Sequence, residues 1–162
     1  MKMKNDYNLV LVDGSSYLFR AYHALPDLIS SKGQPTGAIK GTISMIRKLM
    51  SDYPDSEVVV VFDAKGKTFR NEIYSEYKAN RPAMPEDLKS QISIIQEIIL
   101  LMGLPMLSIS GVEADDVLGT LAAQASERNF GTLISTMDKD LAQLVSPSVT
   151  LLNTMTGNIL DE

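Results

Sequence analysis

The stretch Glu57–Phe62, with the sequence EVVVVF, constrains the fold more than any other part of the chain. Its apolar run shows no alternation with polar residues, which is typical of a central parallel strand that is covered on both faces. Parallel strands are joined by crossover connections that usually contain a helix. The run therefore predicts an α/β fold, in which a mainly parallel central sheet carries helices on both faces.

The rest of the chain alternates short apolar runs with segments of helical period. Strands are expected over Leu9–Val12, Glu57–Phe62, Met106–Ile109, Thr132–Ser135, Val149–Leu152 and Ile159–Leu160. Helices are expected over Tyr17–Ala24, from Ala38 to Met50, from Pro85 to Met102, over Ala114–Arg128 and over Lys139–Val145. A length of 162 residues predicts a single domain over 1–162, with the polar residues 64–85 as an excursion from it.

Composition narrows the chemistry that this domain can perform. The chain has no cysteine and one histidine, His23, which excludes disulfides, thiol catalysis and multi-histidine zinc sites. A metal site would need oxygen ligands, which suit Mg²⁺ or Mn²⁺ better than Zn²⁺. The amino terminus lacks the apolar stretch of a secretory signal and the apolar runs are too short to cross a bilayer, so we expect an intracellular protein with no membrane partner.

Carboxylates follow four of the expected strands at the point where each strand ends. They are Asp13, Asp63, Glu113, Asp115, Asp116, Asp138 and Asp140. One such acid alone is more often a helix cap, but the ends of parallel strands share one edge of the sheet, where such folds bind ligands. Carboxylates gathered there would repel one another without a cation. The pattern indicates a metal site, and two ions about 4 Å apart can hydrolyse phosphodiesters without histidine or cysteine.

A basic segment follows Asp63 on a chain whose formal net charge is −5. Residues 64–81 hold five cations and three interleaved rings: Lys65, Lys67, Arg70, Lys78 and Arg81, with Phe69, Tyr74 and Tyr77. Cations for phosphates and rings for unpaired bases are the components of a surface that binds single strands. The alternative is a solvated amphipathic helix whose rings pack inward. A position beside the expected metal site favours nucleic-acid binding.

Five stretches of the chain resemble the 5′ nuclease domain of bacterial DNA polymerase I, a member of the flap endonuclease group. They are LVDGSSYLFRAYHA (11–24), VVFDAKGKTFR (60–70), YKANRPAMP (77–85), SGVEADDVLGTLA (110–122) and STMDKDLAQLV (135–145). The resemblance implies a PIN-like fold and a Mg²⁺- or Mn²⁺-dependent 5′ nuclease, with two ions in the complete domain. The implied partners are DNA with 5′ flaps or ends, RNA primers and the polymerase domains of a full-length chain, in replication and repair in the bacterial cytoplasm at the nucleoid.

The resemblance also implies roles for individual residues. The seven strand-end acids match the metal ligands of the family, and Lys78 and Arg81 match a catalytic pair near the scissile phosphate. Nucleic-acid contacts are implied for Arg20, Lys65, Lys67, Arg70 and Tyr77. Residues 64–85 match a clamp, or arch, over the single strand.

Two departures and two alternatives accompany this interpretation. Met137 stands where the family usually has glycine, and the family continues past Glu162 into further carboxylates and a helix-three-turn-helix element that grips duplex DNA. The first alternative is therefore a fragment that binds metal and nucleic acid without turnover. The second is a receiver domain, which would need an acidic pair at the end of the first strand, where this chain has Asp13 alone.

Overall fold

The computed structural model describes residues 6–24, 27–79 and 83–162. Within these ranges six strands form one sheet in the order β3-β2-β1-β4-β5-β6. Their bounds are β1 Leu9–Asp13, β2 Glu57–Val61, β3 Met106–Leu107, β4 Thr132–Thr136, β5 Val149–Asn153 and β6 Ile159–Leu160. The predicted parallel sheet is confirmed, with one antiparallel strand, β6, at an edge.

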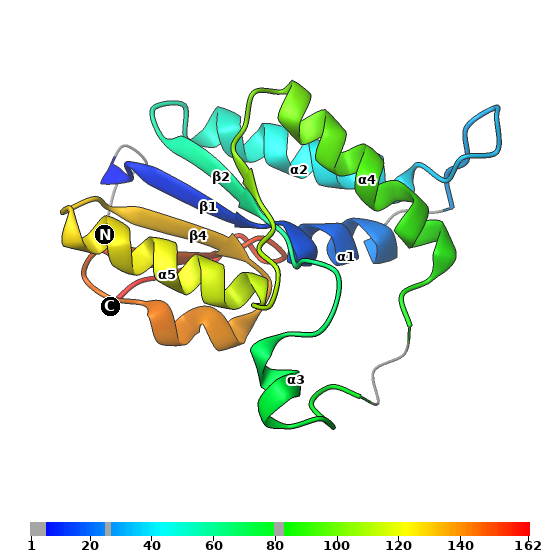
Figure 1. Cartoon of the computed structure of the whole chain (residues 1–162). Helices are drawn as coiled ribbons and strands as arrows, with labels where there is room; N and C mark the ends of the chain where they lie inside the picture. Colours follow the sequence, from blue (N-terminus) through cyan, green and yellow to red (C-terminus); the bar gives the residue numbers. More distant parts are fainter. Residues whose placement is uncertain (1–5, 25–26, 80–82) are drawn as a thin grey trace.

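The chain order of the strands reverses direction between β1 and β4, which lie side by side at the centre of the sheet (Figure 1). From β1 the chain builds outward to β2 and β3, and it then returns to β4 on the other side of β1 and continues outward. In open α/β sheets the carboxyl ends of two such strands form the crevice in which ligands bind. The site should therefore lie where Asp13 and Thr136 end these two strands.

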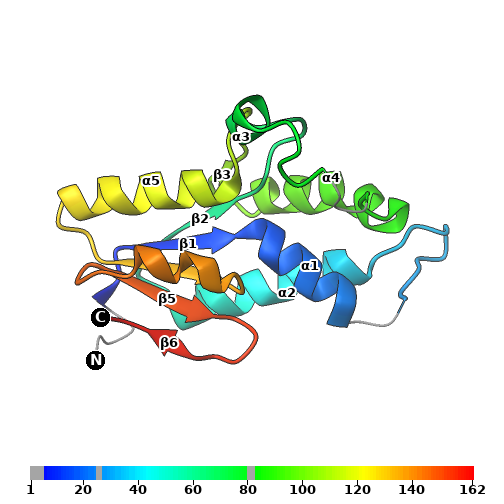
Figure 2. The same cartoon turned by 90° about the horizontal axis from the view of Figure 1, so that it is seen from below.

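Helices cover both faces of the sheet, as predicted (Figures 1 and 2). Their bounds are α1 Gly14–Ala24, α2 Gly37–Asp52, α3 Phe69–Ile73, α4 Glu86–Leu101, α5 Ala114–Glu127 and a 3₁₀ helix, η2, Lys139–Leu144. Val10 and Val12 of β1 pack with α1, α2 and α4 on one face, whereas Leu11 packs with α5 and η2 on the other. Successive residues of a central strand are thus both buried, which explains the unbroken valine run of β2.

Two of the boundaries that differ from those predicted have a clear physical reason. Helix α1 begins at Gly14 instead of Tyr17, directly after β1. An added Cβ at Gly14 would lie 2.8 Å from ring atoms of Phe62 and 2.9 Å from the carbonyl oxygen of Val61, so glycine permits this close start. Strand β3 ends at Leu107 instead of Ile109, because its pairing with β2 stops at Val61.

The excursion between β2 and α4 contains a short helix, α3, that sequence periodicity did not predict. It projects beyond the layered body of the molecule (Figure 1). The backbone N–H of Phe69 donates to the carbonyl of Gly111 at 2.8 Å and ties α3 to the loop that precedes α5. The alternative interpretation, an amphipathic helix that packs its apolar side chains inward, does not hold at Ile73, because this side chain is 80% exposed. In the described parts of the chain, no helix has the length and apolarity needed to span a bilayer.

Candidate metal centre

Asp13 occupies the crevice between β1 and β4 and is held there by two donors. The hydroxyl of Thr136 donates to Oδ2 at 2.7 Å, and the backbone N–H of Ser16, in the first turn of α1, donates to Oδ1 at 3.3 Å. The side chain is nearly inaccessible, with 4% exposure. A buried carboxylate fixed through both oxygens is a rigid starting point for a cation site.

Asp63 and the acids of α5 reach the same edge from β2. Asp63 follows β2, and its Oδ1 accepts the backbone N–H of Ala114, the first residue of α5, at 2.7 Å. Its own N–H donates to the hydroxyl of Ser15 at 3.3 Å. The Asp63 carboxylate thus accepts a backbone N–H at the start of α5 and holds this end of the helix beside the end of β2. The acids in the first turn of α5 therefore lie at the sheet edge.

Five of the seven predicted acids line one open hollow of about 260 Å³. They are Asp13, Asp63, Glu113, Asp115 and Asp138, together with Ser15, Ser16, Phe19 and Lys78. Four separate strand ends therefore contribute acids to one place, as the sequence pattern predicts. Their roles as metal ligands stay a prediction.

The electrostatics of this hollow favour the arrival of a positive charge. Burial, and then the charges of Asp13, Asp138, Asp63 and Glu113, raise the pKa of Asp115 from 3.8 to about 6. Burial likewise raises the pKa of Asp13, against the hydrogen bonds from Thr136 and Ser16 that lower it. A divalent cation would reverse both effects, because it favours the ionised form of every carboxylate that faces it.

Two of the acids are instead engaged by the basic segment. Arg70 binds both carboxylate oxygens of Asp116 at 2.7 Å and also Oε2 of Glu113 at 2.9 Å. Lys78 lies 2.6 Å from Oε1 of Glu113, and the hydroxyl of Tyr77 donates to the same carboxylate. The Arg70 hydrogen bond holds the pKa of Asp116 below its usual range. Two predicted nucleic-acid contacts, Arg70 and Tyr77, and the predicted catalytic residue Lys78 thus lie against the acids.

The predicted acids do not all converge to one point. Within 6–24, 27–79 and 83–162, no three His, Cys, Asp or Glu side chains form a group that could hold an ion as they stand. Asp140 is exposed on η2, where its N–H donates to Asp138, and it does not line the hollow. Arg20, Lys65 and Lys67 likewise lie outside the lining. Arg81 falls outside the described residues.

Several residues of the site carry no acidic signal and were missed. The sequence predicts no role in the site for Thr136, Phe19, Ser15 or Ser16. The structure uses the serine hydroxyls to hold the ends of neighbouring strands, and it places the 41% exposed ring of Phe19 on the wall of the hollow. The side chain of Met137 does not line the hollow, and its N–H donates to Ser16 at 2.7 Å.

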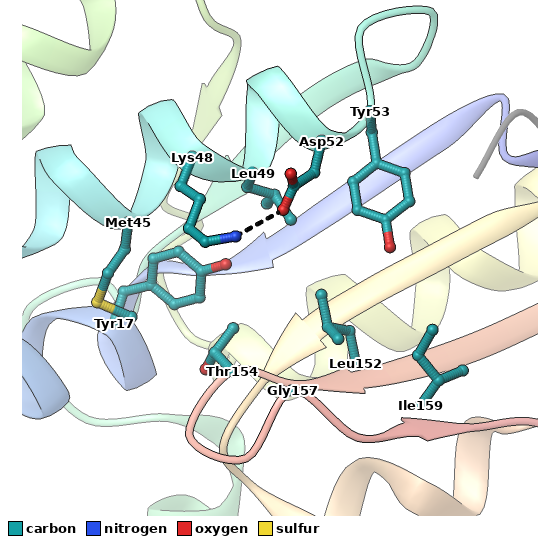
Figure 3. Close-up of a pocket in the computed structure, with 10 residues that line it drawn as sticks. All are labelled: Tyr17, Met45, Lys48, Leu49, Asp52, Tyr53, Leu152, Thr154, Gly157 and Ile159. Carbon is teal, nitrogen blue, oxygen red and sulfur yellow. Dashed lines mark hydrogen bonds and ion pairs between the residues drawn. The ribbon is translucent and has the colours of Figure 1, made fainter.

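A second hollow, of about 320 Å³, lies elsewhere, between α2 and the β5–β6 hairpin (Figure 3). Its walls include Met45, Leu49, Leu152 and Ile159, and an exposed ion pair joins Lys48 to Asp52 at 3.0 Å. None of the predicted site residues lines it. Chemistry that needs several carboxylates therefore belongs to the smaller hollow at the strand ends.

The sequence matches a known family over most of its length. A family model described as "5'-3' exonuclease, N-terminal resolvase-like domain" matches residues 8–162. The chain belongs to the 5′-3′ exonuclease family. The predicted resemblance is thus confirmed over nearly its whole length, and the strand-end acids lie within the matched region of the exonuclease domain.

Curated relatives show the same membership. DNA polymerase I of Pseudomonas aeruginosa is 58% identical over 153 residues, which cover 94% of this chain and 17% of that protein. A 5′-3′ exonuclease of Buchnera aphidicola is 48% identical over 159 residues, which cover 98% of this chain and 53% of the relative. The chain thus spans about half the length of the stand-alone exonuclease and a smaller share of the polymerase.

Solved structures confirm the fold. A bacteriophage T5 5′-exonuclease, crystallised with divalent zinc ions, matches with a TM-score of 0.73 at 24% identity, over 95% of this chain and 58% of that one. The catalytic core of Rad2, in complex with DNA, matches with a TM-score of 0.55 at 19% identity, over 91% of this chain and 44% of that one. The predicted PIN-like arrangement of a mainly parallel sheet between helices is therefore confirmed.

Proposed function

We propose that this exonuclease-family domain is the catalytic part of a divalent-metal-dependent 5′ nuclease that hydrolyses phosphodiesters. The observation that carries the proposal is the gathering of acids from four strand ends around one hollow, where burial and the neighbouring carboxylates raise the pKa of Asp115 and Asp13. The oxygen-only donor set suits Mg²⁺ or Mn²⁺. Membership of the family supports the same reaction class.

The residues that would hold the ions are Asp13, Asp63, Asp115 and Asp138, with Glu113 and Asp116 beside them and Asp140 at the margin. A bound divalent ion supplies a water of lowered pKa and stabilises charge on the phosphate. The protein's part is to fix the carboxylates: Ser16 and Thr136 hold Asp13, and the start of α5 holds Asp63. In the complete domain we propose two ions.

The basic segment would bind the substrate strand. Lys78 lies on the wall of the hollow, where its charge can stabilise a phosphate under attack. Tyr77 and Arg70 come from the same excursion and offer a ring and a planar cation. We propose that residues 64–85, including Arg81, form the clamp over a single strand, and that Arg20, Lys65 and Lys67 contact phosphates farther from the site.

The proposed substrates are DNA with 5′ flaps or ends and RNA primers, processed during replication and repair in the bacterial cytoplasm. Support comes from relatives that are named 5′-3′ exonuclease or DNA polymerase I. In the polymerase relatives the matched region is 17% of a longer protein. We therefore propose that polymerase domains accompany this domain in a full-length chain.

The test is cleavage of a 5′-flap DNA labelled at its 5′ end, at equal concentrations of the chain and two variants. Wild-type protein is expected to release the labelled flap with Mg²⁺ or Mn²⁺ and to stop when EDTA is added. Asp63→Asn should fall to the background rate, because it removes an acid of the hollow. Asp55→Asn is the matched control, because Asp55 precedes β2 and lies at the opposite ends of the strands.

Each outcome separates the candidate functions. Metal-dependent binding of the flap with no release of label would replace the nuclease with a binding fragment. Cleavage by Asp63→Asn at the wild-type rate would contradict the assignment of the site. A receiver domain would instead take up phosphate from a small phosphodonor on an aspartate, and the pairing of Asp13 with Thr136 and Ser16 does not provide the acidic pair that such a domain needs.

A further inference from the structure

One hydroxyl connects two acids that come from different strands. The Thr136 hydroxyl donates to Asp13 Oδ2 at 2.7 Å, and its oxygen accepts the backbone N–H of Asp138 at 2.9 Å. Thr136 is 1% exposed and Asp13 is 4% exposed, so water has little access to either partner. The Thr136 hydroxyl therefore fixes the position of the turn after β4 relative to Asp13 at the end of β1.

Ser16 makes a second connection between the same two segments. Its backbone N–H donates to Asp13 Oδ1, and its hydroxyl accepts the N–H of Met137 at 2.7 Å. Two consecutive N–H groups of the turn, those of Met137 and Asp138, are thus bound by hydroxyls from α1 and β4. Each Asp13 oxygen has one protein donor, which fixes the plane of the carboxylate.

We propose that Thr136 is a positioning residue of the metal centre, because its hydroxyl sets the orientation of Asp13 and the place of the Asp138 turn before a cation binds. This inference rests on the proposed function, and it deepens that function by naming a residue that touches neither substrate nor ion. Partners that orient carboxylate ligands typically change metal affinity by about 10- to 100-fold when they are removed.

A buried threonine on a strand can also serve packing alone, and the chain contains such a residue for comparison. Thr132 lies four residues earlier on β4, on the same face of the sheet, and is 0% exposed. Among the described residues its hydroxyl has no hydrogen-bond partner. Burial on β4 therefore does not itself require a bonded hydroxyl, and the two threonines form a matched pair.

The experiment measures Mn²⁺ affinity by calorimetry on the wild-type chain and on Thr136→Val, Thr136→Ser and Thr132→Val. Valine keeps the shape of threonine and removes the hydroxyl. Thr136→Val is expected to bind Mn²⁺ about 10- to 100-fold more weakly, whereas Thr136→Ser and Thr132→Val should stay within about threefold of wild type. Urea unfolding in EDTA checks that each variant is folded, and Thr136→Ala replaces Thr136→Val if that variant is not.

Four results would overturn the proposal. The first is wild-type Mn²⁺ affinity in Thr136→Val. The second is an equal loss of Mn²⁺ affinity in Thr132→Val. The third is a Thr136→Ser variant that binds Mn²⁺ as weakly as Thr136→Val. Either of these two results would show that any change of β4 disturbs the site. The fourth is a wild-type chain that binds no Mn²⁺, which removes the metal centre of the proposed function as well. Wild-type binding with unchanged Thr136→Val affinity leaves that function intact and removes only the positioning role.

Discussion

Replacing Asp115 with asparagine is expected to stabilise the metal-free protein at neutral pH. Asp115 lies in the first turn of α5 and lines the acidic hollow. Burial and the charges of the facing acids, Asp13 first, raise its pKa from 3.8 to about 6. Ionised Asp115 is therefore less favourable in the folded chain than in the unfolded one, and Asp115→Asn removes that penalty.

The size and sign of the effect follow from linkage. A raised pKa means that the folded state keeps its proton to higher pH, so stability falls as pH rises from about 4 to about 6 and is level above that. Without screening, the pKa shift would correspond to about 3 kcal/mol in the free energy of unfolding, since one pKa unit is about 1.4 kcal/mol. Because the side chain is partly exposed, solvent screening reduces the expected gain to about 1–2 kcal/mol at pH 7.

The assay is urea unfolding in EDTA at several pH values between 4 and 8. The free energy of unfolding of Asp115→Asn minus that of wild type should be smallest near pH 4 and rise to its plateau above pH 6. Asp55→Asn, which makes the same charge change at the opposite ends of the strands, is the control and should show no such rise. A difference that is independent of pH, or that falls as pH rises, would refute the raised pKa of Asp115 and the burial and neighbouring charges to which it is attributed.

Two other substitutions test the packing and the charge pairing of the site. Gly14→Ala should lower the free energy of unfolding, measured in urea, by about 1–3 kcal/mol, because the added Cβ would lie 2.8 Å from the Phe62 ring. In the control, Gly119→Ala, the added Cβ lies 3.5 Å from the nearest side chain. An equal loss of stability in Gly119→Ala would contradict the steric explanation. Arg70→Gln should tighten Mn²⁺ binding several-fold in calorimetry, because the guanidinium competes for two acids of the site. Lys67→Gln removes the same charge from an exposed neighbour, and an equal gain in that variant would show general electrostatics instead of competition.

The sheet could be predicted because its signals are local. The unbroken valine run predicts strand β2 without knowledge of its neighbours. The spacing of apolar positions by four and three residues predicts helix α2 in the same way. The early start of α1 could not be predicted in this way. It depends on Phe62, 48 positions later in the chain, lying against a residue that lacks a Cβ. The same holds for β3, whose end is set by its partner.

The acidic members of the site could be found because strand ends and charge are both visible in the sequence. The residues that orient them could not, since a threonine at the end of a strand looks the same whether its hydroxyl binds Asp13 or nothing. Thr132 begins β4 and Thr136 ends it, both are buried, and the fold gives a hydrogen-bond partner to the hydroxyl of Thr136 and none among the described residues to that of Thr132. The engagement of Glu113 and Asp116 by Arg70 was equally hidden, because it joins residues more than 40 positions apart.

The distribution of positive charge indicates where a cation is needed most. Glu113 and Asp116 already have the guanidinium of Arg70, which lowers the pKa of Asp116. In the described residues no lysine or arginine forms an ion pair with Asp13, Asp63, Asp115 or Asp138. The carboxylates without such a partner line the hollow at the strand ends, where burial disfavours their ionised form and raises the pKa of Asp13 and Asp115. An ion beside these carboxylates would gain the most from charge neutralisation, whereas one beside Asp116 must first compete with Arg70.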